Sequence, residues 1–294
     1  MLFKTSRIKL TLLYFIAAIV IIILILPVLF MLGNSFMSIN EIISRYSDKI
    51  IPTNFFDFSV NDLHYVNISF IPDKISIEQY ITIFFESPFY LRSYCNTILI
   101  IAPVLIGQFI VSPIAAYGFQ YITCRKKELI FSVYILIILM PIQVLLVPQK
   151  IIVNFFNMDD SYWAIILPGI FNPISVFLIR QHLKNFPYEC KEAAYIDGAS
   201  EIKVFLHVVY PNMKTILFAL FMLNFSEYWN LIDQAIVFIK SLYKMPLSLY
   251  LADIIQNNMG MLFAASSFFA LPPVLVFLSG EDHLVNGISL SGIR

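Results

Sequence analysis

Charged residues are scarce in this chain of 294 residues. They make up 13% of the sequence, against about 25% in an average soluble domain, while hydrophobic residues make up 59%. This composition excludes an ordinary soluble domain and indicates an integral membrane protein, whose long apolar runs, described below, predict an all-α fold. The formal net charge is zero, so the distribution of charge along the chain is more informative than its sum.

Chemically reactive residues are also few. The cysteines and histidines lack the spacing of a metal site, a disulfide framework or a hydrolase triad. They are Cys95, Cys124, Cys190, His64, His182, His207 and His283. The sequence also lacks Gly-x-x-x-x-Gly-Lys-[Ser/Thr], so it has no loop that cradles nucleotide phosphates. We therefore expect no enzyme activity, no catalytic residue, no metal and no cofactor bound by this chain.

Long apolar runs are what the sequence does contain. The first, from Leu10 to Leu32, is too long for the core of a signal peptide and is interpreted as a retained membrane helix. Crossing a hydrocarbon core of about 30 Å takes roughly 20 helical residues. Further runs of that size lie near 94–119, 129–150, 162–180, 213–239 and 259–280. The sequence predicts six transmembrane helices, with several prolines expected to kink or end them.

Lysine and arginine indicate the orientation, because cytoplasmic loops collect them. The short loop at Arg125, Lys126 and Lys127 is the clearest indicator, and it places both termini in the cytoplasm. In this orientation a smaller group of basic residues lies on the external side of the membrane. The predicted organisation is an N-terminal transmembrane helix (1–33), an extracytoplasmic loop (34–90), a core of five transmembrane helices (91–282) with a cytoplasmic loop (184–212), and a C-terminal tail (283–294). The 34–90 loop could be a small folded cap or an irregular loop.

The stretch KEAAYIDGASEIKVFLHVVYP is unusually polar for this chain. Pro187 suits a helix start, Gly198 suits a left-handed residue that closes the helix, and Ser200 can cap a second helix running to Pro211. The small side chains of Ala193 and Ala194 would allow another protein to approach the helix closely, beside the carboxylates of Glu192 and Asp197. A docking surface and a passive amphipathic connector are both consistent with this pattern.

The motif resembles the cytoplasmic loop of permeases from binding-protein-dependent ABC importers. That loop carries Glu-Ala-Ala, then a glycine and a distal Ile-x-Leu-Pro, and the matching residues here are Glu192, Ala193, Ala194, Gly198, Val208, Tyr210 and Pro211. Val208 and Tyr210 depart from the pattern. Further similarities narrow the resemblance to carbohydrate importers, specifically MalG-like subunits of the maltose type. They are LRSYCNT, AAYGF, MPIQ, LIRQ, YWN and MPLSL, in matching order.

The resemblance implies a type I importer permease (MetI-like) fold in the bacterial cytoplasmic membrane. It implies that residues 184–212 hold the coupling helix, which docks on an ABC ATPase through Glu192, Ala193, Ala194, Asp197, Gly198 and Pro211. The implied partners are a second permease in a heterodimer, two ATPase subunits that bind ATP and Mg, an extracytoplasmic solute-binding protein and a sugar or oligosaccharide. No nucleic acid is expected.

Polar residues inside the fifth apolar run are candidates for a translocation path. Polar groups within the bilayer are costly, so they mark function or helix packing. The candidates are Asn224, Glu227, Tyr228, Trp229 and Asn230. Lining the path and joining helices are both open interpretations.

Two other classes of protein fit part of the sequence. An ion- or proton-coupled secondary transporter would account for Glu227 but not for the polar loop. A membrane-anchored assembly subunit would account for the loop but not for the polar fifth run. Within ABC importers, a phosphate, peptide or polyol remains possible as the solute.

Overall fold

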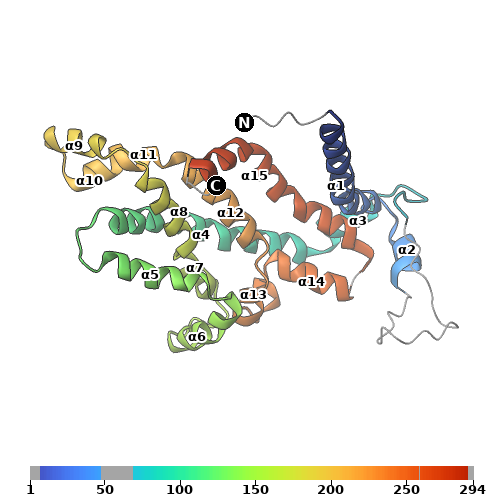
Figure 1. Ribbon diagram of the computed structural model, residues 1–294. Helices are drawn as coiled ribbons and strands as arrows, with labels where there is room; N and C mark the ends of the chain where they lie inside the picture. Colours follow the sequence, from blue (N-terminus) through green and yellow to red (C-terminus); the bar gives the residue numbers. More distant parts are fainter. Residues whose placement is uncertain (1–6, 48–68, 258, 291–294) are drawn as a thin grey trace. The chain divides into compact units, whose positions relative to one another are not determined.

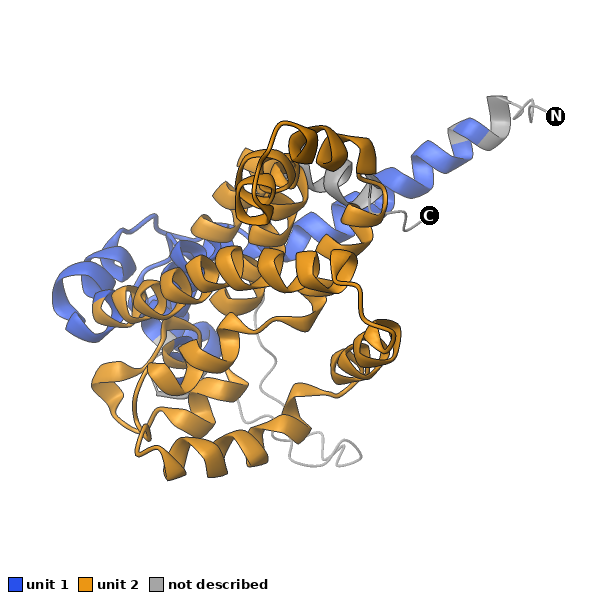
Figure 2. Cartoon of the chain, turned by 90° about the vertical axis from the view of Figure 1, so that its left-hand side faces the viewer, with its two compact units in different colours: residues 1–91, 251–270 blue, residues 92–250, 271–294 orange. Residues whose placement is uncertain are grey.

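The computed structural model describes residues 7–47, 69–257 and 259–290. Within these residues the regular structure is helical, and an isolated antiparallel bridge joins Met37 to Ile75 (Figure 1). The chain forms two compact units, coloured separately in Figure 2. Unit 1 comprises residues 1–91 and 251–270, and unit 2 comprises residues 92–250 and 271–294. The predicted all-α fold is confirmed.

Four helical stretches of the described chain are long and apolar enough to cross a membrane singly. They are Leu12–Asn34, Pro88–Tyr121, Trp163–Lys184 and Leu262–Gly280. Two bent pairs bring the number to six if each pair is one span. The pairs are Lys127–Ile138 with Ile142–Phe155, bent by 101°, and Glu201–Asn212 with Lys214–Trp229, bent by 68°. Six spans therefore require two broken helices.

Prolines lie at two helix boundaries of unit 2, one within a bent pair and one within the Trp163–Lys184 stretch. The predicted third run, 129–150, is not one helix: α5 (Lys127–Ile138) ends and α6 (Ile142–Phe155) begins after Pro141. Proline has no N–H to donate and disfavours a helical residue before it, so it stands at a helix start. Similarly, α7 (Trp163–Ile170) is followed by α8 (Pro173–Lys184), whose first turn is capped by the Asn172 side chain accepting from the Ser175 amide at 3.0 Å.

The predicted fifth run, 213–239, is also divided. The helix α12 (Lys214–Trp229) stops before Asn230, and α13 (Asp233–Phe238) follows a short break. Asp233 lies in the first turn of α13 and accepts a hydrogen bond from Gln143 of α6 at 2.8 Å. A carboxylate in the first turn favours a helix N-terminus. Of the expected polar and aromatic residues, four lie within α12, and Asn230 lies just beyond its end.

Unit 1 is built around the buried amide of Gln79. Its Nε2 donates to the carbonyl oxygens of Asn34 and Met37, each at 2.8 Å, and its Oε1 accepts from the Ala264 amide at 3.2 Å. These bonds join several short elements, so the described part of the 34–90 segment is folded. The elements of unit 1 are α1 (Arg7–Asn34), α2 (Ile39–Ile42), η1 (Ile43–Ser47), α3 (Glu78–Ile81), η2 (Thr82–Glu86) and η5 (Met259–Met261). Residues 48–68 of the segment lie outside the described residues.

Three helices contain residues of both units. They are α4 (Pro88–Tyr121), α14 (Leu247–Asn257) and α15 (Leu262–Leu290). The last of these continues into the segment predicted as a C-terminal tail. In unit 2 the core packs α4, α8 and α12 together through fully buried side chains such as Ala116, Ile179 and Ile216.

One end of unit 2 is held by a cluster of ion pairs. Asp159 pairs with Lys150 and Lys240, while Asp160 lies 3.1 Å from Lys244 Nζ. The Asp160 carboxylate also accepts hydrogen bonds from the amides of Lys240 and Ser241, at 2.8 and 2.9 Å. Hydrogen bonding to Ser241 lowers the pKa of Asp160 well below its usual range, and Lys240 and Lys244 add to this effect. The cluster joins the chain after α6 to the short turn η4 (Leu242–Lys244).

Candidate functional site

The polar stretch forms two short helical pieces with a glycine between them. The helix α9 (Tyr188–Ile196) ends at Gly198, which has a positive φ of 79°. The Gly198 amide donates to the Tyr195 carbonyl and the Ala199 amide to the Ala194 carbonyl, both at 3.0 Å. These two bonds form a Schellman motif, which requires a left-handed residue. The predicted left-handed conformation of Gly198 is confirmed.

The second piece is a continuous helical run with a widened turn. It consists of α10 (Glu201–Val204), the π-turn η3 (Phe205–Val209) and α11 (Tyr210–Asn212). Ser200 stands at the N-cap with extended backbone, as predicted, but its side chain makes no capping hydrogen bond. Pro211 lies inside the last turn, half-buried. Figure 1 shows α9, α10 and α11 grouped at one end of unit 2. We refer to residues 188–212 as the α9–α11 segment.

The outer face of the α9–α11 segment is exposed and mixed in character. Glu192, Ala193 and Asp197 are all exposed. Beside them, Ile196 is 86% exposed, and Ile202 across the turn is 71% exposed. Isoleucine exposed to this extent is costly in water, and isoleucines next to two carboxylates make a surface suited to a protein partner with an apolar and basic cleft.

The inner face anchors the segment on the helices below it. Val204 and Val209 are fully buried in the core that α4, α8 and α12 share, and Ala194 packs against it. The two alanines of the motif therefore differ: Ala193 faces outward, whereas Ala194 faces the core. Tyr210, which departs from the motif, packs its ring against Phe205 at 5.9 Å and donates to the Phe109 carbonyl at 3.4 Å.

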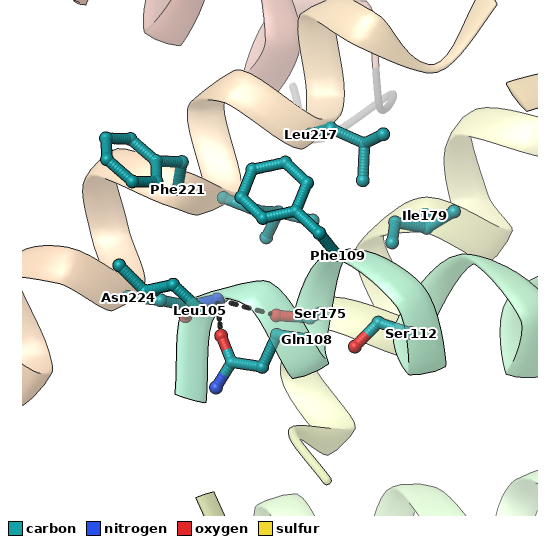
Figure 3. A pocket seen from close by; sticks show the side chains of 10 residues that line it. Leu105, Gln108, Phe109, Ser112, Ser175, Ile179, Leu217, Phe221 and Asn224 are labelled. Atoms are coloured by element: carbon teal, nitrogen blue, oxygen red, sulfur yellow. Dashed lines mark hydrogen bonds between the residues drawn. The ribbon is translucent and has the colours of Figure 1, made fainter. Parts of the chain in front are cut away.

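A second polar group lies inside unit 2, centred on Asn224 of α12. Its Nδ2 donates to Gln108 Oε1 at 2.7 Å and to Ser175 Oγ at 3.0 Å, as drawn in Figure 3. Its Oδ1 accepts from Asn172 Nδ2 at 3.3 Å. Gln108 in turn donates to the Gly169 carbonyl at 2.7 Å. The network joins α4, α8 and α12 through hydrogen bonds that satisfy the buried amide.

The space beside the Asn224 network is small. A cavity of about 10 Å³ lies between Gln108, Ser112, Ser175 and Asn224, which is room for about one water molecule. No sugar ring fits such a volume. In this conformation of the chain the network therefore serves as a packed contact between helices.

Burial divides the five polar and aromatic candidates, four in α12 and Asn230 at its C-cap, into two groups. Asn224, Tyr228 and Trp229 are buried, and the Tyr228 hydroxyl donates to the Gly169 carbonyl at 3.2 Å. Glu227 and Asn230 are exposed. They share one face of α12 because three residues advance a helix by nearly one turn. If any of the five faces a translocation path, Glu227 and Asn230 are placed to do so.

Comparison with known families decides between the classes of membrane protein. Residues 3–286 match the family described as binding-protein-dependent transport system inner membrane component. The chain belongs to this family. It is therefore a multi-pass permease subunit, a transport component of an importer, and the ion-coupled secondary transporter is excluded.

Individual relatives agree with the family. The permease is 24% identical over 232 residues to the arabinooligosaccharides transport system permease protein AraQ of Bacillus subtilis, a match that covers 78% of this chain and 83% of AraQ. It is 29% identical over 198 residues to the sn-glycerol-3-phosphate transport system permease protein UgpE of Pectobacterium atrosepticum, covering 66% and 70% of the two chains.

A solved structure has the same fold. It is described as a bacterial ABC transporter involved in the import of the acidic polysaccharide alginate. The TM-score is 0.75 at 17% identity, and the match covers 96% of this permease and 98% of the other chain. The predicted importer-permease fold is confirmed.

Three polar residues of this permease were not predicted from the sequence, although the fold gives each of them a polar or aromatic partner. Gln108 lies within an apolar run, and its polarity there was a signal that could have been used. Lys191 and Glu201 lie in the α9–α11 segment but were not singled out, because their partners Tyr117 and Tyr121 are remote in sequence.

Proposed function

We propose that this permease imports a sugar or oligosaccharide across the bacterial cytoplasmic membrane, driven by ATP hydrolysis on partner subunits. The observation that carries the proposal is the outer face of the α9–α11 segment, where Glu192, Ala193 and Asp197 are exposed around a turn fixed by Gly198. This face acts as the coupling surface for an ABC ATPase. ATP and Mg bind to that partner and not to this chain.

The mechanism is a change in equilibrium between two conformations. ATP can move the permease only if the ATPase contacts differ between the inward-open and outward-open states. The α9–α11 segment supplies those contacts, and its buried Val204 and Val209 pass the motion to the core of α4, α8 and α12. A second permease, in a heterodimer, completes the path, and Glu227 and Asn230 of α12 border it. An extracytoplasmic binding protein delivers the solute.

Charge placement supports cytoplasmic termini. Arg125 and Lys126, between α4 and α5, are exposed, as expected for a cytoplasmic loop. At the opposite end of unit 2, Lys150, Lys240 and Lys244 are paired with Asp159 and Asp160. Pairing reduces the net positive charge of the end that we assign to the outside.

The substrate class follows from the names of the relatives. AraQ belongs to an arabinooligosaccharide system, and the chain covers most of its length. UgpE belongs to a system for sn-glycerol-3-phosphate, which makes a phosphorylated polyol the second candidate. The two candidates differ in charge, so uptake experiments separate them.

The test uses the permease complex with its partner subunits reconstituted in vesicles. We expect binding protein loaded with an oligosaccharide to stimulate ATP hydrolysis and uptake, and sn-glycerol-3-phosphate to do neither. Stimulation by sn-glycerol-3-phosphate alone would replace the sugar proposal with the polyol phosphate.

The coupling surface is tested by Glu192→Lys, which reverses an exposed charge without touching the core. The variant should lose most of the copurifying ATPase if Glu192 meets a basic group, because a like-charge contact in an interface costs several kcal/mol. Lys203→Glu, which reverses another exposed charge on the same segment, is the matched control. Full ATPase binding and uptake by Glu192→Lys would refute the proposed docking role.

A further inference from the structure

Lys191 is a charged residue buried on the inner side of α9. It is 2% exposed, although Glu192, its neighbour in the chain, is exposed. Its Nζ lies 3.5 Å from the ring centre of Tyr121 and 4.6 Å from that of Tyr117, both at the end of α4. Cations are attracted to the faces of aromatic rings at such distances. The lysine of α9 is therefore held by the rings of α4.

Glu201 of α10 completes the cluster. Its Oε1 lies 3.6 Å from Lys191 Nζ. The hydroxyls of Tyr117 and Tyr195 donate to its two carboxylate oxygens. Burial lowers the pKa of Lys191, and the charge of Glu201 opposes this effect. A buried ammonium group is tolerated when it is paired, and here the carboxylate and the rings supply the pairing.

The cluster connects elements that the chain does not join directly. The α9–α11 segment follows α8 and precedes α12, so motion of α9 reaches those two helices along the backbone. The helix α4 is remote in sequence, and it meets the segment through non-covalent contacts, among them the hydrogen bond from Tyr210 to the Phe109 carbonyl. Contacts of Lys191 and Glu201 with Tyr117 and Tyr121 link α4 to both α9 and α10.

We propose that Lys191 and Glu201 are positioning residues that pass the movement of α9 to α4 during the transport cycle. This inference rests on the proposed function, in which the outer face of the same segment docks on the ATPase. Lys191 acts behind the docking surface, so losing its charge should uncouple the reaction without releasing the ATPase.

The decisive variant is Lys191→Met in the complete reconstituted complex, because methionine keeps the length and apolar stem of the side chain and removes the charge. We expect the ATPase to copurify as in the wild type and the uptake per ATP hydrolysed to fall about three- to tenfold, the range expected for a coupling residue. Lys191→Arg keeps a cation over the rings and should restore most of the ratio.

Tyr121 offers a matched pair of controls. Among the described residues its buried hydroxyl has no hydrogen-bond partner. Tyr121→Phe keeps the ring face and should leave uptake per ATP unchanged, whereas Tyr121→Leu removes the ring and should lower the ratio as Lys191→Met does.

Two results would overturn the inference. One is an unchanged ratio of uptake to hydrolysis in both Lys191→Met and Tyr121→Leu. The other is loss of the ATPase, hydrolysis and uptake in equal proportion, which is the result of a purely structural role. If the proposed function is wrong, Glu192→Lys retains the ATPase and full uptake. The proposed role of Lys191 would then fail together with the proposed docking surface.

Discussion

The α9–α11 segment and the Asn224 network use polar residues in opposite ways. Glu192 and Asp197 of the segment are exposed. Asn224 is buried and bonded to Gln108, Ser175 and Asn172 on neighbouring helices. Within the bilayer a polar group needs a partner in the chain, whereas a polar group outside the bilayer can face water or a partner protein. Exposure separates the two uses, although the residue types resemble each other.

The contrast also divides the candidates within α12. Glu227 and Asn230 resemble the segment in being exposed, while Asn224 and Tyr228 belong to the packed interior. Substitutions in the segment, on the exposed face and in the packed interior should therefore affect assembly, uptake and stability separately.

The largest effect is expected for Gly198→Val. The φ of 79° is strongly disfavoured for a β-branched residue, at a cost of at least about 1–2 kcal/mol, while an added Cβ would meet nothing within 4 Å. The strain is therefore in the backbone, and it should turn the outer face of α9 away from the ATPase. We expect ATPase copurification and uptake to fall by about tenfold or more.

Gly118→Ala is the control for Gly198→Val. Gly118 lies in α4, and a Cβ there would meet Ile122 Cδ1 at an ordinary 3.4 Å. This variant should retain the ATPase and uptake. Normal assembly and transport by Gly198→Val would show that the angle between α9 and α10 has no part in docking.

An intermediate effect on stability is expected for Asn224→Leu. It leaves Gln108 Oε1 and Ser175 Oγ without the donor that Asn224 supplies, and interhelical hydrogen bonds in membranes contribute about 0.6–2 kcal/mol each. The melting temperature of the purified permease should fall. Glu227→Ala, on the exposed face, should leave the melting temperature unchanged and reduce uptake if Glu227 borders the path.

Two results would contradict these roles of Asn224 and Glu227. Asn224→Leu can reduce uptake through instability alone, so uptake is measured per folded complex. A normal melting temperature with lost uptake would assign Asn224 to the path. A lowered melting temperature in Glu227→Ala would assign Glu227 to packing.

The smallest effect is expected for Asp160→Asn in the ion-pair cluster. The carboxylate is partly exposed, so solvent screening limits its contribution to about 1 kcal/mol. Its pKa is lowered in the folded state, so its contribution is complete above the ordinary pKa of about 4 and is lost only as the pH falls through the lower folded value. The difference in melting temperature between wild type and variant should therefore be constant between about pH 5 and 7.5. A difference that shrinks on lowering the pH through this range would contradict the assignment.

Local backbone chemistry made parts of the fold predictable. Gly198 was expected in a left-handed conformation because only glycine adopts it freely after a helix. The apolar runs predicted six spans, and the described residues contain four, or six if each bent pair is one span. A kink or end at a proline was expected in the third run, but the break after Trp229 in the fifth run was missed, because hydropathy does not show where a helix bends.

The family motif, the all-α class and the turn at Gly198 were predictable from the sequence, because each depends on residues close together in the chain. The burial of Lys191 beside the exposed Glu192, and the bonds from Asn224 to Gln108 and Ser175, became known only from the packing of the helices. Lys191 meets Tyr121, and Asn224 meets Gln108, from helices remote in sequence. Burial and pairing of a side chain depend on which helices pack around it, and the residues that flank it in the chain do not contain that information.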